Sequence, residues 1–292
     1  MEDNIPGIIS EPNGMGNNLR IRGLNSRYIL FLVDGERLVG EGAGGNINLD
    51  QIDVANIKRI EMINGAASVL YGSNAVGAVI NVITKEPQEA IAAGCDISYQ
   101  SNNTAKTRVH IESRQNKFLS QASIYRNDIK DKITQYEVVN ELGGLEKYYK
   151  NTSSATITGL DINFSAIIFR HLYLKGSYSL CDATDNATGE QLSGNVKHSG
   201  TASATWNGNF LKGQYSVQIA GRFSSPHSYS SSGKTSLSKP YNIWKAVITK
   251  RFHLGKNDLN LTLKCDNLFN FQDPTFINPG RQYLIGLNYK FN

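Results

Sequence analysis

The chain has few cysteines, few charges and no long apolar run, and each shortage excludes a class of protein. Three Cys in 292 residues allow at most one internal disulfide, so the chain is not a disulfide scaffold. No run of about 18 consecutive apolar residues occurs, which excludes a helical membrane protein. Charged residues make up only 19%, and a net charge of +5 is too small to indicate a nucleic-acid partner.

The N-terminal segment lacks the features of a signal peptide. Met1 is followed by Glu2, Asp3 and Asn4, and neither a basic region nor an apolar region follows. The protein is therefore expected to be either cytoplasmic or exported by a signal that this sequence does not include. The rest of the sequence favours the second.

Residues 1–88 predict a compact α/β domain. With 14 Tyr and 11 Phe, the chain is too rich in aromatic residues to be intrinsically disordered. The apolar run of residues 28–33 stops at Asp34-Gly35, which is typical of a strand that enters a tight turn. The sequence predicts strands over 28–33, 36–39, 57–63 and 78–84, and short helical segments over 49–55 and 66–70.

From residue 89 onward, apolar and polar residues alternate. In residues 211–223 the odd positions are mostly apolar and the even positions are mostly polar. Roughly ten such segments lie between residues 90 and 292, and polar turns separate them. Alternation over about 9–11 residues is typical of a transmembrane β-barrel.

Soluble β-sandwiches and lipocalin-like barrels also alternate, so the alternation alone leaves them open. Three details favour the membrane barrel. The apolar faces are long and no second apolar face is present to pack on them. An aromatic residue, Phe291, lies next to the C-terminal residue and beside an amphipathic strand. A closed dry core would also not tolerate the charges on the inward faces, which are Lys175, Lys212, Arg222, Lys264 and Lys290.

Several motifs in residues 21–85 resemble the plug of TonB-dependent outer-membrane receptors. They are Ile21-Arg22-Gly23, Leu32-Val33-Asp34-Gly35, residues 57–61 and the long stretch of residues 65–85. Residues 266–270, 279–281 and 289–291 resemble the end of the barrel in the same family. The chain is thus expected to be mainly β: a partial antiparallel transmembrane β-barrel of about ten strands, residues 89–292, with an N-terminal α/β plug domain, residues 1–88.

The resemblance implies a location and partners. It implies the outer membrane of a Gram-negative bacterium, with contact to outer-membrane lipid and to the TonB energy-transducing complex. It also implies import of a scarce ligand, which would be a ferric siderophore, haem or cobalamin. A non-transporting surface barrel or binding protein built from receptor parts is the alternative.

The plug motifs supply the candidate site residues. Gly65, Gly72 and Gly77 stand where the chain must turn sharply or pack closely. The charged candidates are expected either to pair with wall residues inside a barrel lumen, or to be surface charges or pairs within the plug. The candidates are Arg22, Gly23, Asp34, Gly35, Arg59, Glu61, Gly65, Tyr71, Gly72, Gly77 and Asn81.

The sequence departs from the family in size. A plugged outer-membrane transporter has about 22 strands, and this chain predicts about ten. No TonB box is visible before residue 5, and the middle strands are missing at a break near residues 115–125, as after an internal deletion. We therefore expect an open, curved sheet that partly wraps the plug, with edges near residues 91–99 and 281–291. Closure of a small barrel that expels the plug is the alternative.

No catalytic, cofactor or metal site is predicted. The five His show no metal-ligand spacing, none of them lies in residues 1–90, and no G-x-S-x-G motif is present. The Gly-rich loop of residues 40–45 lacks the Lys-Ser/Thr of a phosphate-binding loop. The chain is thus expected not to be an enzyme. Residues 224–238 predict a long, exposed, Ser-rich hairpin loop, the kind of loop that carries ligand contacts, but the ligand stays open.

Overall fold

The computed structural model describes residues 8–13, 16–21, 24, 28–37, 56–64, 78–101, 103–139, 144–192, 195–210, 213–231, 234–272 and 280–290. Its strands form four sheets, with two, ten, two and four strands. The predicted helical segments, 49–55 and 66–70, lie outside these residues. Within the described ranges, no helix is long and apolar enough to cross a membrane.

The N-terminal part builds a four-stranded sheet that confirms the predicted strands. Its order is β4-β3-β6-β5, and only β3 and β6 run parallel. Its strands are β3 (Ile29–Val33), β4 (Glu36–Arg37), β5 (Ile57–Asn64) and β6 (Ala78–Thr84). The shorter strands β1 (Ile8–Asn13) and β2 (Gly16–Ile21) pair with each other as a hairpin.

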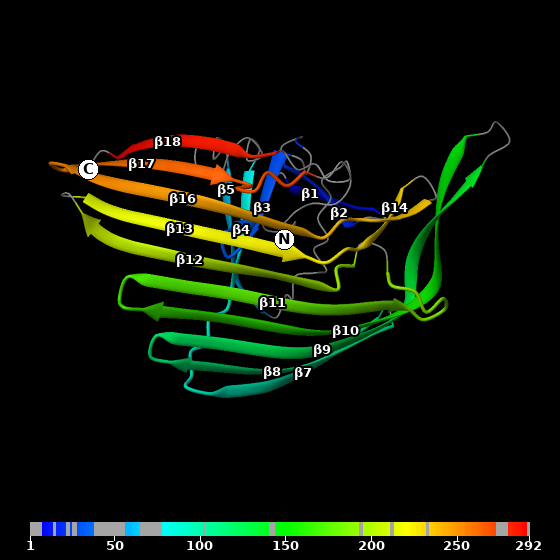
Figure 1. Cartoon of the computed structure of the whole chain (residues 1–292). Coiled ribbons are helices and arrows are strands. Elements are labelled where there is room, and N and C mark those ends of the chain that lie inside the picture. Colours follow the sequence, from blue (N-terminus) through cyan, green and yellow to red (C-terminus); the bar gives the residue numbers. More distant parts are fainter. Residues whose placement is uncertain are drawn as a thin grey trace.

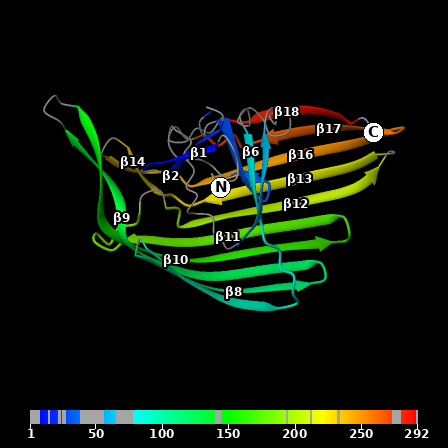
Figure 2. The ribbon, with the colours of Figure 1, turned by 180° about the vertical axis from the view of Figure 1, so that it is seen from behind.

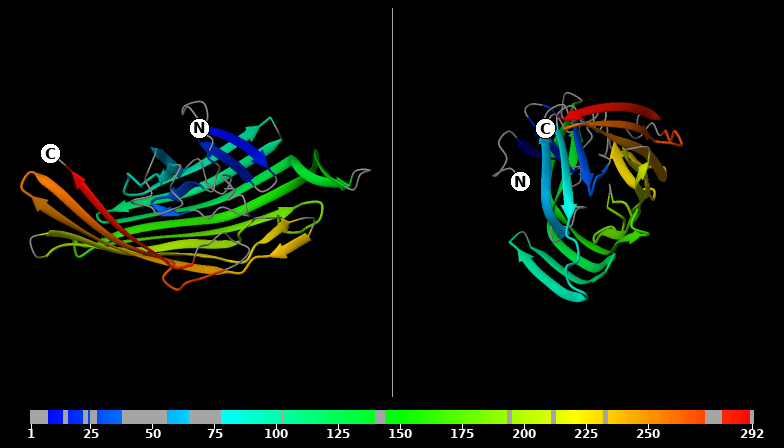
Figure 3. Two further views of the ribbon diagram at one scale, coloured as in Figure 1. Left: turned by 90° about the horizontal axis from the view of Figure 1, so that it is seen from above. Right: turned by 90° about the vertical axis from the view of Figure 1, so that its left-hand side faces the viewer.

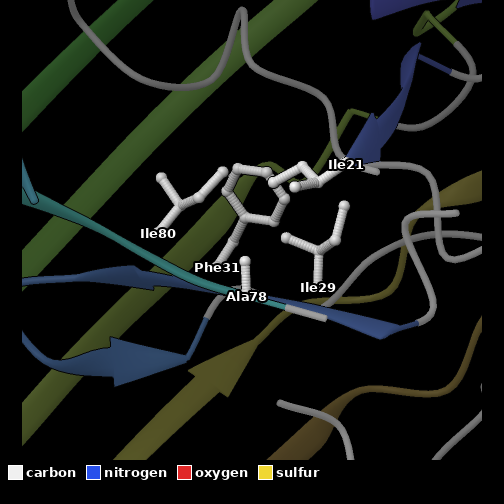
Figure 4. Close-up of a cluster of buried hydrophobic side chains, with 5 residues drawn as sticks. All are labelled: Ile21, Ile29, Phe31, Ala78 and Ile80. Carbon is white, nitrogen blue, oxygen red and sulfur yellow. The ribbon is translucent and has the colours of Figure 1, made fainter. Parts of the chain in front are cut away.

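The core of this part surrounds the two parallel strands. The side chains of Ile29, Phe31 and Ile80 point toward one another and meet Ile21 and Ala78 (Figure 4). On the opposite face of the sheet, Leu30, Leu32 and Val79 form a second buried cluster. Burial on both faces explains why β3 and β6 are continuous apolar runs rather than alternating ones.

The C-terminal part is one ten-stranded antiparallel sheet, as predicted. Its order is β18-β17-β16-β13-β12-β11-β10-β9-β8-β7 (Figure 1). The strands are β7 (Ala92–Gln100), β8 (Thr104–Gln115), β9 (Phe118–Val139), β10 (Leu145–Ile168), β11 (Leu172–Asp185), β12 (His198–Phe210), β13 (Gly213–Ser224), β16 (Tyr241–Leu254), β17 (Asn257–Asp266) and β18 (Gln282–Lys290). A separate hairpin, β14 (Ser228–Ser231) with β15 (Lys234–Leu237), lies between β13 and β16.

The two faces of this sheet differ as the alternation predicts. Ile97, Ile124 and Ile285 point away from the plug and are 78%, 66% and 75% exposed. On the concave side, Arg108 and Gln121 are buried. The period of two along each strand therefore separates an apolar outer surface from a polar inner one.

The ten-stranded sheet is open and partly wraps the four-stranded sheet. Figures 2 and 3 show the wall as an arc, with the N-terminal strands on its concave side and across its open side. Strands β7 and β18 form the two edges of the arc. This confirms the expected incomplete sheet with edges near residues 91–99 and 281–291. The N-terminal sheet ends at Thr84 and the wall begins at Ala92, but the domain boundary after residue 88 stays a prediction.

The connections differ in length at the two ends of the wall. At one end, residues 116–117, 169–171 and 255–256 make short turns, in which Asn116 and Gly255 have φ angles of 51° and 67°. At the other end, residues 186–197, 225–240 and 267–281 make longer connections, whereas only residues 101–103 join β7 to β8 there. The C-terminus lies at the short-turn end (Figure 1).

Candidate functional site

The tight turn after β3 is held by side chains from β6. Asp34 and Gly35 have φ angles of 50° and 82°, as a turn with two left-handed residues requires. Thr84 donates its N–H to Asp34 Oδ1 at 3.0 Å and its hydroxyl to Asp34 Oδ2 at 2.6 Å. Gly35 donates its N–H to Asn81 Oδ1 at 3.0 Å. Three candidate residues, Asp34, Gly35 and Asn81, therefore meet in one network.

Sequence reasoning did not select Thr84 as a member of this network. The parallel register places Val33 beside Val82, so the ends of both strands reach the same edge of the sheet. A polar residue at the end of β6 is therefore within reach of the Asp34 carboxylate. Asp34 and Thr84 are 50 residues apart along the chain, and only the pairing of β3 with β6 shows that they meet.

The same turn reaches the inner wall. Lys245 of β16 donates from Nζ to the carbonyl oxygen of Gly35 at 3.4 Å. Lys245 stands on an inward position of the wall, where charged residues are expected. This contact joins the turn after β3 to the C-terminal half of the wall.

A buried polar contact ties the other side. Asn56, directly before β5, accepts hydrogen bonds at Oδ1 from Arg108 Nη2 at 2.5 Å and from Gln121 Nε2 at 3.1 Å. All three side chains are buried, with exposed fractions of 9%, 8% and 7%. Asn56 also accepts the N–H of Lys85 at its carbonyl oxygen, at 2.7 Å. In a buried site such charge-assisted bonds are worth more than exposed ones.

The segment that links the plug sheet to the wall lies alongside the end of β8. Arg114 donates its N–H to the carbonyl oxygen of Glu89 at 2.9 Å, and Ser113 donates its hydroxyl to that of Ala90 at 2.8 Å. Arg114 also reaches the carbonyl oxygen of Pro87 from Nη1, at 3.4 Å. These hydrogen bonds fix the segment that follows the plug sheet to the first strands of the wall.

The charged candidates on β5 pair with each other. Arg59 donates from Nε to Glu61 Oε1 at 2.7 Å, and both side chains are about half exposed. They lie two residues apart on an edge strand, so they share one face. An exposed pair of this kind contributes about 0–1 kcal/mol to stability. The other candidates, Arg22, Gly23, Gly65, Tyr71, Gly72 and Gly77, lie outside the described residues.

A cavity of about 520 Å³ opens at the long-loop end of the wall. Aromatic side chains dominate its lining, and the Arg222 guanidinium lies 5.6 Å from the centre of the Tyr241 ring. Phe223, Phe269 and Phe271 contribute further rings. The hollow is open rather than enclosed, so it can contact one side of a small molecule but does not surround it.

The Ser-rich connection beside the cavity is less exposed than expected. Residues 228–237 form a hairpin, but Ser224 and Ser238 at its base are buried. The His227 backbone N–H donates to Ser238 Oγ at 3.0 Å, and Nδ1 lies 3.0 Å from the same oxygen. Because His227 is buried, its pKa is lowered. The predicted hairpin is confirmed by β14 and β15, but the prediction that it is exposed is wrong for its base, where Ser224, His227 and Ser238 are buried.

The described residues hold no group of three or more His, Cys, Asp or Glu side chains that could bind a metal ion. Cys95, Cys181 and Cys265 are free. The candidate functional groups among the described residues are therefore hydrogen-bonding and aromatic side chains.

Comparison with known proteins identifies the family. Residues 1–79 match the TonB-dependent Receptor Plug Domain, and residues 111–268 match the family described as TonB dependent receptor-like, beta-barrel. This chain belongs to the TonB-dependent receptor family. That family consists of receptors, not enzymes, and is found in the outer membrane of Gram-negative bacteria.

Solved structures share the fold of this TonB-dependent receptor chain. The ferric enterobactin receptor of Pseudomonas aeruginosa, in complex with enterobactin, is 16% identical, with a TM-score of 0.62 over 90% of this chain and 45% of that one. The siderophore receptor PirA of Acinetobacter baumannii is 14% identical, with a TM-score of 0.53 over 99% and 55%. BauA, the ferric preacinetobactin receptor of A. baumannii, is 13% identical, with a TM-score of 0.52 over 69% and 33%. The chain thus spans about half or less of these receptors.

Proposed function

We propose that this chain is an outer-membrane receptor that binds a ferric siderophore at its long-loop end, as a shortened member of its family. The observation that carries the proposal is the four-stranded plug sheet seated against the concave wall through Asn56 and Gly35. Such a plug inside an outwardly apolar sheet suits a membrane receptor. The TonB complex and outer-membrane lipid are the proposed partners.

The proposed orientation follows from the connections. In outer-membrane barrels the periplasmic turns are short and the extracellular loops are longer. The short turns at residues 116–117 and 255–256 would therefore face the periplasm, and the aromatic cavity would face outward. The cavity then lies at the outer rim of the wall and is lined from both faces, since Tyr241 shares the lumen face with Gln218 and Phe223 shares the lipid face with Ile219.

The lining of the cavity supports the siderophore class. Phenyl and phenol rings stack on aromatic ligand groups, and the Arg222 guanidinium, which is not part of the lining but lies over the Tyr241 ring, adds positive charge beside it. An anionic ferric complex with aromatic chelating groups matches both features. Haem and cobalamin are the other ligands that the resemblance admits.

A binding protein that does not transport is the second candidate. The open edges at β7 and β18 favour it, because the ten strands do not enclose a lumen. Both candidates place the ligand in the same cavity, so they differ in import and agree on binding.

Binding of a ferric tris-catecholate siderophore tests the proposal. The chain, expressed with a signal peptide in a Gram-negative host, is expected in the outer-membrane fraction and to bind the siderophore. Tyr241→Ala removes a cavity ring and should weaken binding roughly tenfold, a loss of about 1.4 kcal/mol. Tyr215→Ala is the control, since Tyr215 lies on β13 toward the short-turn end and is not part of the lining. Equal effects of the two substitutions, or no binding by the unaltered chain, would contradict the proposal.

A further inference from the structure

The outer face of the wall carries a lysine among apolar side chains, toward the short-turn end. On β16, Lys250 pairs with Tyr215 of β13 on one side and with Leu261 of β17 on the other. Ile248 stands two residues before Lys250 and is 45% exposed on the outer face. Because alternate residues of a strand share a face, Lys250 also points outward, toward the proposed bilayer. Strands β13, β16 and β17 are interior strands of the sheet (Figure 1), so this surface does not depend on how the edges of the wall are completed.

Two aromatic rings position the ammonium group of Lys250. Its Nζ lies 4.8 Å from the centre of the Tyr215 ring and 4.5 Å from the centre of the Phe252 ring. The face of an aromatic ring attracts a cation. An ammonium group has three N–H donors, however, and aromatic rings accept only weak hydrogen bonds. The rings therefore fix where the charge lies, and its donors still favour an anionic oxygen.

No acidic side chain of the neighbouring strands can neutralise this charge. Strands β12, β13 and β16 contain no Asp or Glu. The two acidic residues of β17, Asp258 and Asp266, stand on the lumen face, where they form ion pairs with Arg251 and Lys264. Among the described strands around it, Lys250 thus leaves a positive charge on the outer face.

The level of Lys250 on the wall corresponds to a membrane interface. A tilted strand crosses a bilayer with about 9–11 residues. Strand β16 has 14, so its ends extend beyond the hydrocarbon, and Lys250 stands near the end that precedes the turn at residues 255–256. Further outward aromatic residues mark this end of the wall, namely Phe118, Trp206 and Tyr289. Such a girdle is typical of the bilayer interface, where a charge costs far less than at the midplane.

The turns at the same end carry positive charge. Lys117, Arg170 and Lys256 are exposed residues of the turns at 116–117, 169–171 and 255–256, and none of these three turns contains Asp or Glu. Glu86 and Glu89 precede β7, which is the far edge of the sheet from β16. Each Lys or Arg near a membrane surface attracts anionic lipid. The turns beyond Lys250 therefore favour the same kind of ligand as Lys250 itself.

We infer that Lys250, positioned by Tyr215 and Phe252, binds the phosphate group of an anionic phospholipid in the leaflet that surrounds the short-turn end. Phosphate is the anionic oxygen group that a bilayer supplies at this depth, and acyl chains would pack beside Ile248 and Leu263. The inference rests on the proposed outer-membrane location and names the lipid class at this surface. The site lies at the opposite end of the wall from the aromatic cavity, so siderophore binding does not depend on it.

Quenching of tryptophan fluorescence in vesicles tests the inference. The chain contains two Trp, and Trp244→Phe leaves only Trp206, whose ring lies over Gly208 beside Tyr215. The vesicles consist of phosphatidylcholine to which either phosphatidylglycerol or phosphatidylcholine with a doxyl quencher is added. We expect phosphatidylglycerol to be favoured at Trp206 by roughly fivefold, the effect of one Lys at a membrane surface.

Three variants separate this site from general attraction. Lys250→Met keeps the length of the side chain and removes its charge, so it should abolish the preference. Lys250→Arg keeps a cation over the rings and should retain it. Lys175→Met is the matched control and should also retain it. Lys175 of β11 lies near the short-turn end as well, but it pairs with Ser165 and Ser203 on the lumen face.

Several outcomes would overturn the inference. A preference that persists in Lys250→Met, or one that Lys250→Met and Lys175→Met lower equally, would reduce the effect to diffuse attraction. Equal quenching by the two lipids in the chain that retains Lys250 would reject the site outright. Failure of the chain to insert into either kind of vesicle would instead reject the membrane location on which the inference rests.

A second measurement uses the unaltered chain in mild detergent. Mass spectrometry of the intact complex should show phosphatidylglycerol retained in preference to phosphatidylcholine. Excess inorganic phosphate should not displace it, because free phosphate has no acyl chains. Equal retention of the two lipids, or displacement by inorganic phosphate, would contradict the inference even if Lys250→Met failed to fold.

Discussion

At the scale of single residues, Asn56 carries more of the plug contact than its exposed neighbours do. Replacement by Ala leaves the buried Arg108 guanidinium and the Gln121 amide without this acceptor. We expect a loss of about 1.5–3 kcal/mol in plug seating, because hydrogen bonds to charged groups are worth this much. The measurement is the rate of protease cleavage near residues 85–91. Asn186→Ala in an exposed turn is the control, and cleavage as fast in the control as in Asn56→Ala would refute the role of Asn56.

A second residue-scale prediction concerns pH. Burial lowers the pKa of His227 in the folded chain, whereas the unfolded chain has the ordinary value of about 6.5. The folded state therefore binds fewer protons, and the hairpin should lose stability as pH falls below about 6.5 and change little above it. Hydrogen exchange in residues 228–231, corrected for its intrinsic pH dependence, measures this. His227→Asn should remove the dependence, and a dependence that persists in this variant would show that another group causes it.

At the scale of elements, each wall strand has a lipid side and a lumen side. On β13, Ile219 points outward and Gln218 points inward. Ile219→Arg should cost about 2–4 kcal/mol near the bilayer midplane, and Gln218→Arg should cost far less, because only the first places a charge in lipid. Folding yield into liposomes distinguishes them. Two substitutions with the same yield would argue against the membrane assignment.

At the scale of the whole molecule, the number of strands limits import. An eight-stranded barrel has room only for its own side chains, and a plugged lumen takes about 22 strands, so ten strands cannot enclose the plug. The chain alone is therefore expected not to import. The test is growth on a siderophore, haem or cobalamin as sole source, in a strain that lacks the receptors for all three. TonB-dependent rescue by this chain alone would show that the strand count does not limit import.

Much of this architecture was predictable because it depends on local pattern. Alternation along residues 89–292 predicts strands and their apolar face, since successive side chains point to opposite sides of a sheet. The Asp34-Gly35 pair predicts a turn because only few residues adopt left-handed conformations readily. The continuous apolar runs at residues 29–33 and 78–84 predict central strands, because a strand that is buried on both faces does not alternate. The shortage of strands likewise follows from counting along the chain.

The contacts that seat the plug were decided by the tertiary structure alone. Asn56 meets Arg108 and Gln121 across 52 and 65 residues, and Gly35 meets Lys245 across 210. No periodic pattern marks these residues, because their partners depend on how the arc curves around the plug. The sequence by itself therefore determined the strands of the wall and of the plug sheet, their faces and their approximate number, but not the β1–β2 hairpin. Curvature and long-range register decided which polar groups meet and which two edges remain open.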